Sequence, residues 1–466
     1  MGTIGYLEAG VQRLSDAMYG AVTIYGMNLQ DGYQYNIWLE IARWTGPLVT
    51  AVAILYVCRW VGTMIHWKFT CFAEDSVAVY CDDDTKITFD KQKHAVIYPK
   101  REFVSNAKSH IIMLETDEES LRFYEKNKNE LKGKKVYIGL REISYGLVKD
   151  QKGISFFDID GTISRKLWKE QIKLWEKPAD RKVCSITICG TGHLGRNILN
   201  YALMLNLYSL EQQITYNFVG DNNIYQIEHR DFQMENNDQL NFYSAKSEGI
   251  DEMLKNSDIV ILTREIPVEQ LQVIGVLCNH GEIYYYDPAG EPQNGSTSRR
   301  NDESDTTGEA EEGGIAKYLE FKNLHPFGCN KTIFTDENIR KNKLILAAME
   351  QNFNYLKSTK KIGQEDTKES KWEELDRFDK WSNISSSDFA TVIRALRDKV
   401  RIEELAELEH IRWCRFHYLN HWKFGECNGV NKDKQKKIHT CLRPYGELPP
   451  EEQEKDIRTV KSVLEK

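Results

Sequence analysis

The sequence predicts an α/β protein in which one membrane-spanning helix precedes two parallel-sheet domains and a small all-α domain follows them. Three observations indicate this organisation: a long apolar segment near the N-terminal end, a repeated alternation of short β-branched runs with amphipathic segments, and a tryptophan-rich helical C-terminal region. A chain of 466 residues is long enough for several domains. The domain boundaries that we expect are 1–70, 72–180, 181–357 and 371–466.

The long apolar segment extends from Trp44 to Lys68, and Arg59 is the only formal charge before Lys68. About 20 apolar residues in a helix cross a hydrocarbon core of about 30 Å, so we expect a spanning helix at about 44–67. Arg59 and Lys68 lie in its C-terminal half, which favours a cytoplasmic location for that end. The chain is therefore predicted to be a single-pass protein of the inner (cytoplasmic) membrane, with its bulk in the cytoplasm. A buried core helix is the alternative.

A shorter apolar segment precedes it, within residues 16–32. Its apolar part, Met18–Leu29, is too short to span a bilayer. A re-entrant pore helix and an interfacial helix both fit this length. The stretch Thr23–Met27 has only a distant likeness to a potassium-channel filter, because the residue order differs. We therefore favour an interfacial segment or anchor over a conducting pore.

Short β-branched runs alternate with helical segments from Ser76 onward, which is typical of parallel sheets with crossover helices. The runs expected in the first sheet are Ser76–Cys81, His94–Pro99, His110–Leu114, Lys135–Leu140 and Ile154–Ile159. Those expected in the second are the start of Cys184–Leu205, then Ile214–Asp221, Asp258–Thr263, Glu282–Asp287 and Tyr318–Gly328. The polar loop 289–314 is almost free of large apolar residues, and we expect it to be disordered.

A GxGxxG motif, Gly190, Gly192 and Gly195, lies between a predicted strand and a predicted helix. In a Rossmann fold this turn lets backbone amides at the helix N-terminus face a pyrophosphate, and an acidic residue after the next strand holds a ribose. Asp221 is the best match for that residue. The sequence thus predicts a cofactor site for NAD(H) or another nucleotide; the alternative is that the glycines serve packing alone. The first domain has the acidic stretch Cys81–Asp84 where its glycines would be, so it looks degenerate.

The stretch Asp158–Thr162 is similar to the nucleophile signature of haloacid-dehalogenase-type phosphatases. Such an enzyme also needs a second acidic pair for Mg²⁺, and Val219–Asn223 lies in a new sheet about sixty residues later. We therefore expect Asp158 and Asp160 to end a strand and cap a helix that starts near Ser164. The ten cysteines are scattered singly, with no CxxC pair or Cys/His cluster, so no metal ligands are predicted. No catalytic triad or general acid/base pair appears in the C-terminal module, so no catalytic residues are predicted and the protein is not expected to be an enzyme.

The region from about Arg43 to Lys357 resembles tandem TrkA-N domains, which belong to the regulator-of-potassium-conductance type of bacterial membrane proteins. The resemblance rests on the membrane helix that leads into "SVAVYC" and on "ITICGTGHLGRNIL". It implies NAD-binding Rossmann domains that bind dinucleotides, nucleotides or ions. It also implies a homo-oligomer, a dimer or a tetramer.

The C-terminal end, 371–466, resembles the ryanodine-receptor repeat (RyR) domain. The matching residues are Leu405, Ala406, Glu409, His410, Arg412, Trp413, Trp422, Gly425, Lys437, Ile438, His439, Leu442, Pro444, Tyr445, Leu448, Asp456 and Val460. Cys441 stands where the family usually has proline. The resemblance implies a ligand pocket built from Glu409, His410, Arg412, Trp413, Trp422, His439 and Tyr445. The alternative is that the tryptophans anchor a core and that Arg412 pairs with Glu409 on the helix surface.

The net charge of -8 and the pI of about 5.9 argue against nucleic acid as a partner. The order of the segments predicts a membrane-anchored cytosolic sensor or effector that binds a nucleotide-derived signal and couples it to the bilayer segment. The same order predicts that the membrane segment responds by opening a pore or disturbing the bilayer. The resemblance to the RyR domain suggests that the signal belongs to antiviral defence. An NAD(H)-responsive regulatory subunit of a cation channel or transporter is the second hypothesis, and an NAD-dependent oxidoreductase is the third.

Overall fold

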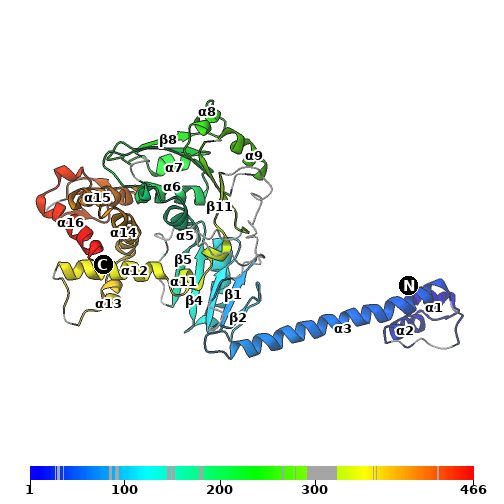
Figure 1. The fold of residues 1–466 in the computed structure, drawn as a ribbon. Coiled ribbons are helices and arrows are strands. Elements are labelled where there is room, and N and C mark those ends of the chain that lie inside the picture. Colours follow the sequence, from blue (N-terminus) through cyan, green and yellow to red (C-terminus); the bar gives the residue numbers. More distant parts are fainter. Residues whose placement is uncertain are drawn as a thin grey trace, which may run out of the picture. The chain divides into compact units, whose positions relative to one another are not determined.

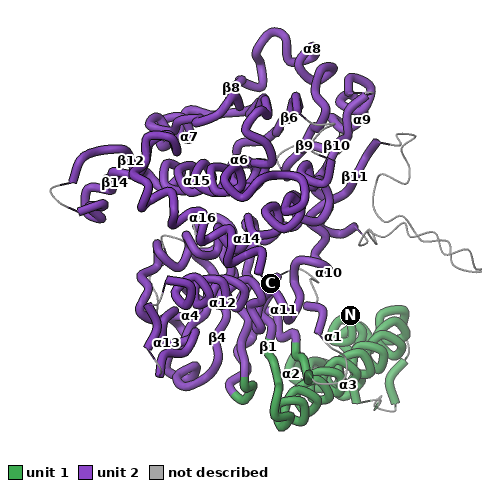
Figure 2. The backbone as a smooth tube through the Cα atoms, turned by 60° about the vertical axis from the view of Figure 1, so that its left-hand side comes forward, with its two compact units in different colours: residues 1–78, 94–97, 106–108 green, residues 79–93, 98–105, 109–466 purple. Residues whose placement is uncertain are grey.

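The computed structural model describes most of the chain, in two compact units. The described residues are 1–26, 28, 32–34, 36–82, 87–89, 94–143, 148, 153–177, 182–264, 267–278, 280–290, 323–359, 361–363, 365–427 and 430–465. Most of the loop 289–314 and part of the acidic stretch after Cys81 lie outside them. One unit contains residues 1–78, 94–97 and 106–108, and the other contains the remainder (Figure 2).

The N-terminal unit is built on three helices, α1 (Gly2–Glu8), α2 (Leu14–Tyr25) and α3 (Ile37–Cys71). The side chain of Asn36 accepts a hydrogen bond from the Leu39 amide and so caps α3, while its amide nitrogen donates to the carbonyl of Gly5 at 2.8 Å. The small core between the helices contains Tyr6, Ala17, Ile24, Leu39 and Ala42.

Helix α3 is 35 residues long, and an 18-residue window within it has a mean hydropathy of 1.8 with no buried residues. It is therefore long and apolar enough to cross a membrane. It begins seven residues before the expected start at 44 and ends four residues after 67. The first part of the shorter apolar segment lies in α2, whose last carbonyl, that of Tyr25, accepts a hydrogen bond from the Thr50 hydroxyl at 2.7 Å. Residues 27 and 29–31 of this segment lie outside the described residues.

The first sheet has the order β2-β1-β3-β4-β5, and the pairs β1–β2, β3–β4 and β4–β5 are parallel. Its strands are β1 (Val77–Cys81), β2 (Val96–Ile97), β3 (Ser109–Met113), β4 (Lys135–Leu140) and β5 (Ile154–Asp158). Helix α4 (Asp117–Leu131) connects β3 to β4 and is capped by Thr116. Each of the five predicted runs overlaps one of these strands, and β3 begins one residue before its run, at Ser109.

The helix after β5 begins earlier than predicted. Helix α5 covers Ile159–Lys166 and continues as a π-helical segment, Leu167–Ile172. The expected start near Ser164 was wrong, because Asp158 itself is the N-cap: its carboxylate accepts a hydrogen bond from the Gly161 amide at 2.7 Å.

The second sheet is parallel throughout, with the order β11-β10-β9-β6-β7-β8. Its two edge strands, β11 and β8, are labelled in Figure 1. Its strands are β6 (Val183–Cys189), β7 (Gln213–Val219), β8 (Gln239–Tyr243), β9 (Ile259–Leu262), β10 (Glu282–Tyr286) and β11 (Leu324–Phe327). Its helices are α6 (His193–Leu205), α7 (Asn223–Glu228), α8 (Ile250–Lys255) and α9 (Val268–Leu277). The sequence did not predict β8, because this edge strand is polar and only partly buried.

The C-terminal region is mainly helical. Its helices are α10 (Asn330–Ile333), α11 (Asp336–Ile339), α12 (Lys343–Ser358), α13 (Lys368–Glu373), α14 (Arg377–Leu396), α15 (Ile402–Leu419) and α16 (Pro450–Leu464). The all-α prediction did not include a small three-stranded sheet, which has the order β12-β14-β13. Its two-residue strands are β12 (Lys423–Phe424), β13 (Lys432–Asp433) and β14 (Ile438–His439).

Helix α14 runs without a break through the serine-rich stretch "SNISSSD", where the sequence predicted an interruption. Serine is a weak helix former when its hydroxyl competes with the backbone. Here the hydroxyls have tertiary partners: Ser385 accepts from Arg412, and Ser386 donates to Glu409. These hydrogen bonds stabilise the serines inside the helix, and the break falls instead at Arg397–Arg401.

A fractionation experiment tests the role of α3. We expect the full chain to stay in the membrane pellet after an alkaline carbonate wash and a chain that begins at Phe72 to move to the supernatant. The reason is that the truncation removes the exposed apolar side chains of α3. If the full chain is extracted by carbonate as readily as the truncated one, α3 does not span the bilayer.

Candidate functional site

The glycine motif forms a tight turn between β6 and α6. Gly190 has φ of +103°, in the left-handed region that favours glycine. A Cβ added at Gly195 would lie 1.9 Å from the carbonyl oxygen of Gly190, so only glycine allows α6 to approach the turn this closely. Gly192 is the N-cap of α6 and has no side-chain capping bond. The first amides of α6 are therefore a suitable anion position if a ligand enters beside them.

A cavity of about 440 Å³ opens beside this turn. Its polar wall includes Gly190, Gly192 and Asp221, and its apolar wall comes mostly from α8 and α9, with Leu254 and Ile274 among its members. We call this cavity the glycine-turn slot. The structure thus brings the predicted acidic residue to the same cavity as the turn, while Gly195 lies behind it in the first turn of α6. The slot also has a second acidic side chain, Asp251 of α8. A mostly apolar slot with an acidic side chain at the end of β7 suits an adenosine group.

The two aspartates of the phosphatase-like stretch serve structural roles. Asp158 caps α5, and burial raises its pKa. Asp160 is fully buried, accepts a hydrogen bond from Arg264 at 2.6 Å and lies 3.2 Å from His193 at the start of α6. Asp160 is therefore an ion-pair partner between the two sheet domains and not the helix cap that the sequence predicted.

Arg412 and Glu409 form a buried pair on α15. The guanidinium donates two hydrogen bonds of 2.8 Å to Glu409 and one of 2.9 Å to Ser385. The pairing named in the alternative is therefore present, but its side chains are only 1% and 4% exposed, so the pair is buried and does not lie on the helix surface. With these donors engaged inside the protein, the predicted role of Arg412 as a fork for a ligand anion has no support from this geometry.

Four more of the predicted pocket residues, His410, Trp413, His439 and Tyr445, take part in an aromatic–histidine core. The His410 ring lies between the Asp456 carboxylate and the Arg443 carbonyl, and its centroid is 5.7 Å from that of Tyr445. Trp413 contacts the rings of His417 and His439 at centroid distances of 4.0 and 4.8 Å.

The lowered pKa values of two histidines also indicate that the side chains of this core serve packing. Burial lowers the pKa of His439 to about 4 and lowers that of His417, so both imidazoles are neutral at pH 7. This packing agrees with the core-anchor alternative. Of the seven predicted pocket residues, Trp422 is the one that lines the cavity between this module and α6.

The sequence did not predict the buried ion pairs that join the C-terminal helices to the sheet domains. Arg415 of α15 is fully buried and donates to the carbonyl of Leu203 in α6 at 2.8 Å and to Asp238 at 3.0 Å. Asp388 of α14 accepts from Arg165 at 2.7 Å and from Lys169 at 3.0 Å. Burial by itself raises the pKa of Asp388, but its two cationic partners outweigh this effect and leave the pKa lowered. The one indication of these ion pairs in the sequence was that a charged residue, such as Arg415 or Asp388, stands among the apolar residues of a helix.

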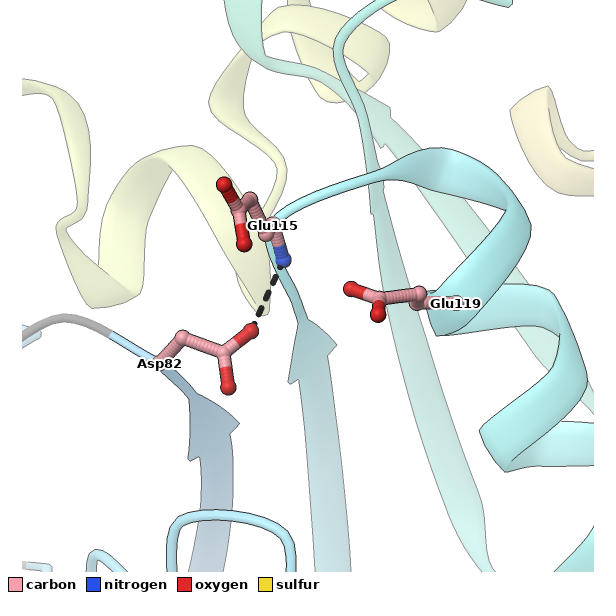
Figure 3. Close-up of side chains that lie close together, drawn as sticks. All are labelled: Asp82, Glu115 and Glu119. Atoms are coloured by element: carbon pink, nitrogen blue, oxygen red, sulfur yellow. Dashed lines mark hydrogen bonds between the residues drawn. The ribbon is translucent and has the colours of Figure 1, made fainter.

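Three acidic residues, Asp82, Glu115 and Glu119, lie close together at the carboxyl ends of β1 and β3 and on α4 (Figure 3). Their ligand atoms lie within 4.8 Å of one another, which is close enough for a metal ion. However, the guanidinium of Arg101 already bridges Asp82 and Glu119, and its hydrogen bond lowers the pKa of Asp82. We therefore assign no ion to this cluster.

Comparison with known proteins identifies one part of the chain. Residues 388–466 match the family model of the RyR domain, which confirms the predicted C-terminal module. No family model supports the TrkA-N resemblance of the two sheet domains. No curated protein and no solved structure matches the chain.

The buried pair of Arg415 predicts a large effect on stability. The Arg415→Ala variant leaves Asp238 buried without its cation, and we expect a loss of about 3–5 kcal/mol in the free energy of unfolding. The matched control is Arg458→Ala on α16, whose partner Glu454 is exposed, with an expected loss of about 0–1 kcal/mol. Denaturant unfolding measures both. Equal losses in the two variants would contradict the anchoring role of Arg415.

The raised pKa of Glu235, whose carboxylate Arg415 attracts, predicts that the stability of the protein depends on pH. Burial raises its pKa from 4.5 to about 7, although Arg415 and His410 attract its carboxylate. Between these pH values the folded state keeps a proton that the unfolded chain releases. The contribution of Glu235 to stability therefore falls as the pH rises from 4.5 to 7, by up to about 3 kcal/mol, and then stays constant. Thermal unfolding of the wild type and of Glu235→Gln between pH 5 and 8 isolates this contribution. Parallel pH profiles would show that Glu235 has no raised pKa.

Proposed function

We propose that this protein is a membrane-anchored cytosolic sensor that binds a nucleotide-type ligand, such as NAD(H), in the glycine-turn slot. Ligand binding shifts helix α6, and α6 passes the shift to the RyR domain. The proposal places α3 in the inner membrane and the larger unit in the cytoplasm, in a homo-oligomer that is a dimer or a tetramer. It includes no catalytic step.

The position of α6 is the observation that carries this proposal. Its N-terminal end is the glycine turn of the slot. Its C-terminal end accepts the hydrogen bond of Arg415 through Leu203, and Met204 accepts one from Ser385 of α14. One rigid helix therefore contacts the slot at one end and the RyR domain at the other. A ligand changes the arrangement only if its affinity differs between the two states.

The resemblance to TrkA-N domains supports the next step, in which the cytosolic rearrangement reaches the bilayer segment. In this proposal the oligomer opens a pore or disturbs the bilayer when the ligand binds. Such an effector is suited to antiviral defence, where a nucleotide signal triggers membrane damage.

A second candidate is a regulatory subunit that responds to NAD(H) and docks onto a separate cation channel or transporter. The observation that favours it is that α3 is the one helix in the described ranges long and apolar enough to span a membrane. Purification from native membranes discriminates the two: a stoichiometric channel protein in the preparation favours the subunit, and leak by the purified chain alone favours the effector.

Binding of NADH to the detergent-solubilised full chain tests the slot. We expect Asp221→Ala to weaken NADH binding at least tenfold, because the carboxylate no longer accepts hydrogen bonds from the ribose hydroxyls. The control is Glu252→Ala, an exposed acidic residue of α8 that does not line the slot. If wild type shows no NADH binding, or if both variants bind equally well, the slot is not the NADH site.

Dye release from liposomes tests the effector step. With the full chain reconstituted, we expect a slot ligand such as NADH to increase release severalfold in the wild type and not in Asp221→Ala. NADH binding without any change in release would leave a sensor but rule out direct membrane disruption by this chain.

A further inference from the structure

A second cavity, of about 660 Å³, lies between α6 and the helices of the RyR domain. We call it the α6–RyR cleft. One wall comes from α6 and includes Arg196, Asn197 and Tyr201, and the facing wall comes from α14, α15 and the residues after α15. Its volume falls in the range of small-molecule sites, which is about 300–1,000 Å³. The cleft is separate from the glycine-turn slot, since the two cavities share no lining residue.

The RyR side of the cleft is an aromatic wall. Phe378 and Trp381 are partly exposed in it, and buried rings support both of them. Phe378 stacks on Trp422 at a centroid distance of 5.0 Å and an interplanar angle of 26°, and Trp381 meets Phe416 edge-on at 5.6 Å. Rings fixed in this way are a ready surface on which a planar base can stack.

Charged groups of both signs line the same cleft. The cations are Arg196, Lys434 and Lys437, and each has donors beyond its present partners. The carboxylates are those of Glu142, Asp158, Glu228 and Asp376. Glu228 pairs with Arg196 and Asp376 pairs with Lys434, so each of these two offers a ligand only its remaining acceptor sites. Such carboxylates accept hydrogen bonds from sugar hydroxyls and from exocyclic amines, but they repel a chain of phosphates. The aromatic wall, the three cations and the carboxylates together therefore suit a ligand with one aromatic base, hydroxyl groups and a single phosphate.

We propose that the α6–RyR cleft is a second ligand site, which binds a nucleoside monophosphate group between Tyr201 of α6 and the wall of Phe378 and Trp381. The neighbouring cavity of about 470 Å³ shares Asp158, Tyr201 and Trp381 with the cleft, so a larger ligand that contains this group also has room. Because α6 borders both sites, a ligand in the cleft holds α6 against the RyR domain and changes the affinity of the slot.

Equilibrium binding of AMP to the full-length protein in detergent tests the site. The measurement uses the Asp221→Ala background, in which the slot is disabled. We expect AMP to bind this variant and its affinity to fall at least tenfold when Trp381→Ala is added. Trp381→Phe retains a ring and should restore most of the affinity. The control is Phe424→Ala, a partly exposed aromatic residue of the RyR domain outside the cleft.

A second variant covers the case in which Trp381→Ala does not fold. Asn197→Trp keeps the aromatic wall but places a large ring in the cleft from α6, and it should also abolish AMP binding. Undiminished AMP binding by folded Trp381→Ala or Asn197→Trp protein would overturn the proposal. Absence of AMP binding in the Asp221→Ala background would overturn it as well. Loss of NADH binding in Asp221→Ala alone concerns only the slot, so the two sites are tested independently.

Discussion

The buried ion pair between Arg415 and Asp238 is the interaction on which the arrangement of the RyR domain depends. Arg415 has no exposed surface, and its donors reach Leu203, Asn236 and Asp238 on the second sheet domain. Asp238 in turn accepts from Gln212 and from the Ile214 amide. An unpaired charge inside a protein is very unfavourable in free energy. Helix α15 therefore packs stably on this domain only in the position in which Arg415 meets Asp238.

Asp388 fixes the other side of the module in the same way, through Arg165 and Lys169 of the first sheet domain. The RyR domain is therefore held to each sheet domain by one buried charged side chain, Arg415 on the second and Asp388 on the first, and α6 lies between them. A docked module held at two such buried contacts either keeps both or rearranges as a whole, which is the behaviour that a switch between two states requires. In the proposed mechanism, ligands in the slot at the start of α6 and in the cleft along its side bias that choice.

Much of the fold follows from local sequence. Apolar β-branched runs predicted ten of the eleven strands of the two sheets, and the glycine pattern at Gly190–Gly195 placed the slot, because these signals act within a few residues. The missing strand, β8, and the unbroken helix α14 depend on tertiary contacts: β8 adds to an existing edge, and the serines of α14 bond to α15. The same limit applies to the site. Whether Arg412 meets a ligand or Glu409 is decided by burial, and the family motif alone does not contain that information.

Hydrogen exchange measures most directly whether ligand in the slot changes the contact between α6 and the RyR domain. With NADH at saturation, we expect a change in amide protection in α15, residues 402–419, in the wild type and none in Asp221→Ala. If NADH binds and the slot amides respond while the exchange of α15 stays the same, the slot and the RyR domain are not coupled, which contradicts the proposed mechanism.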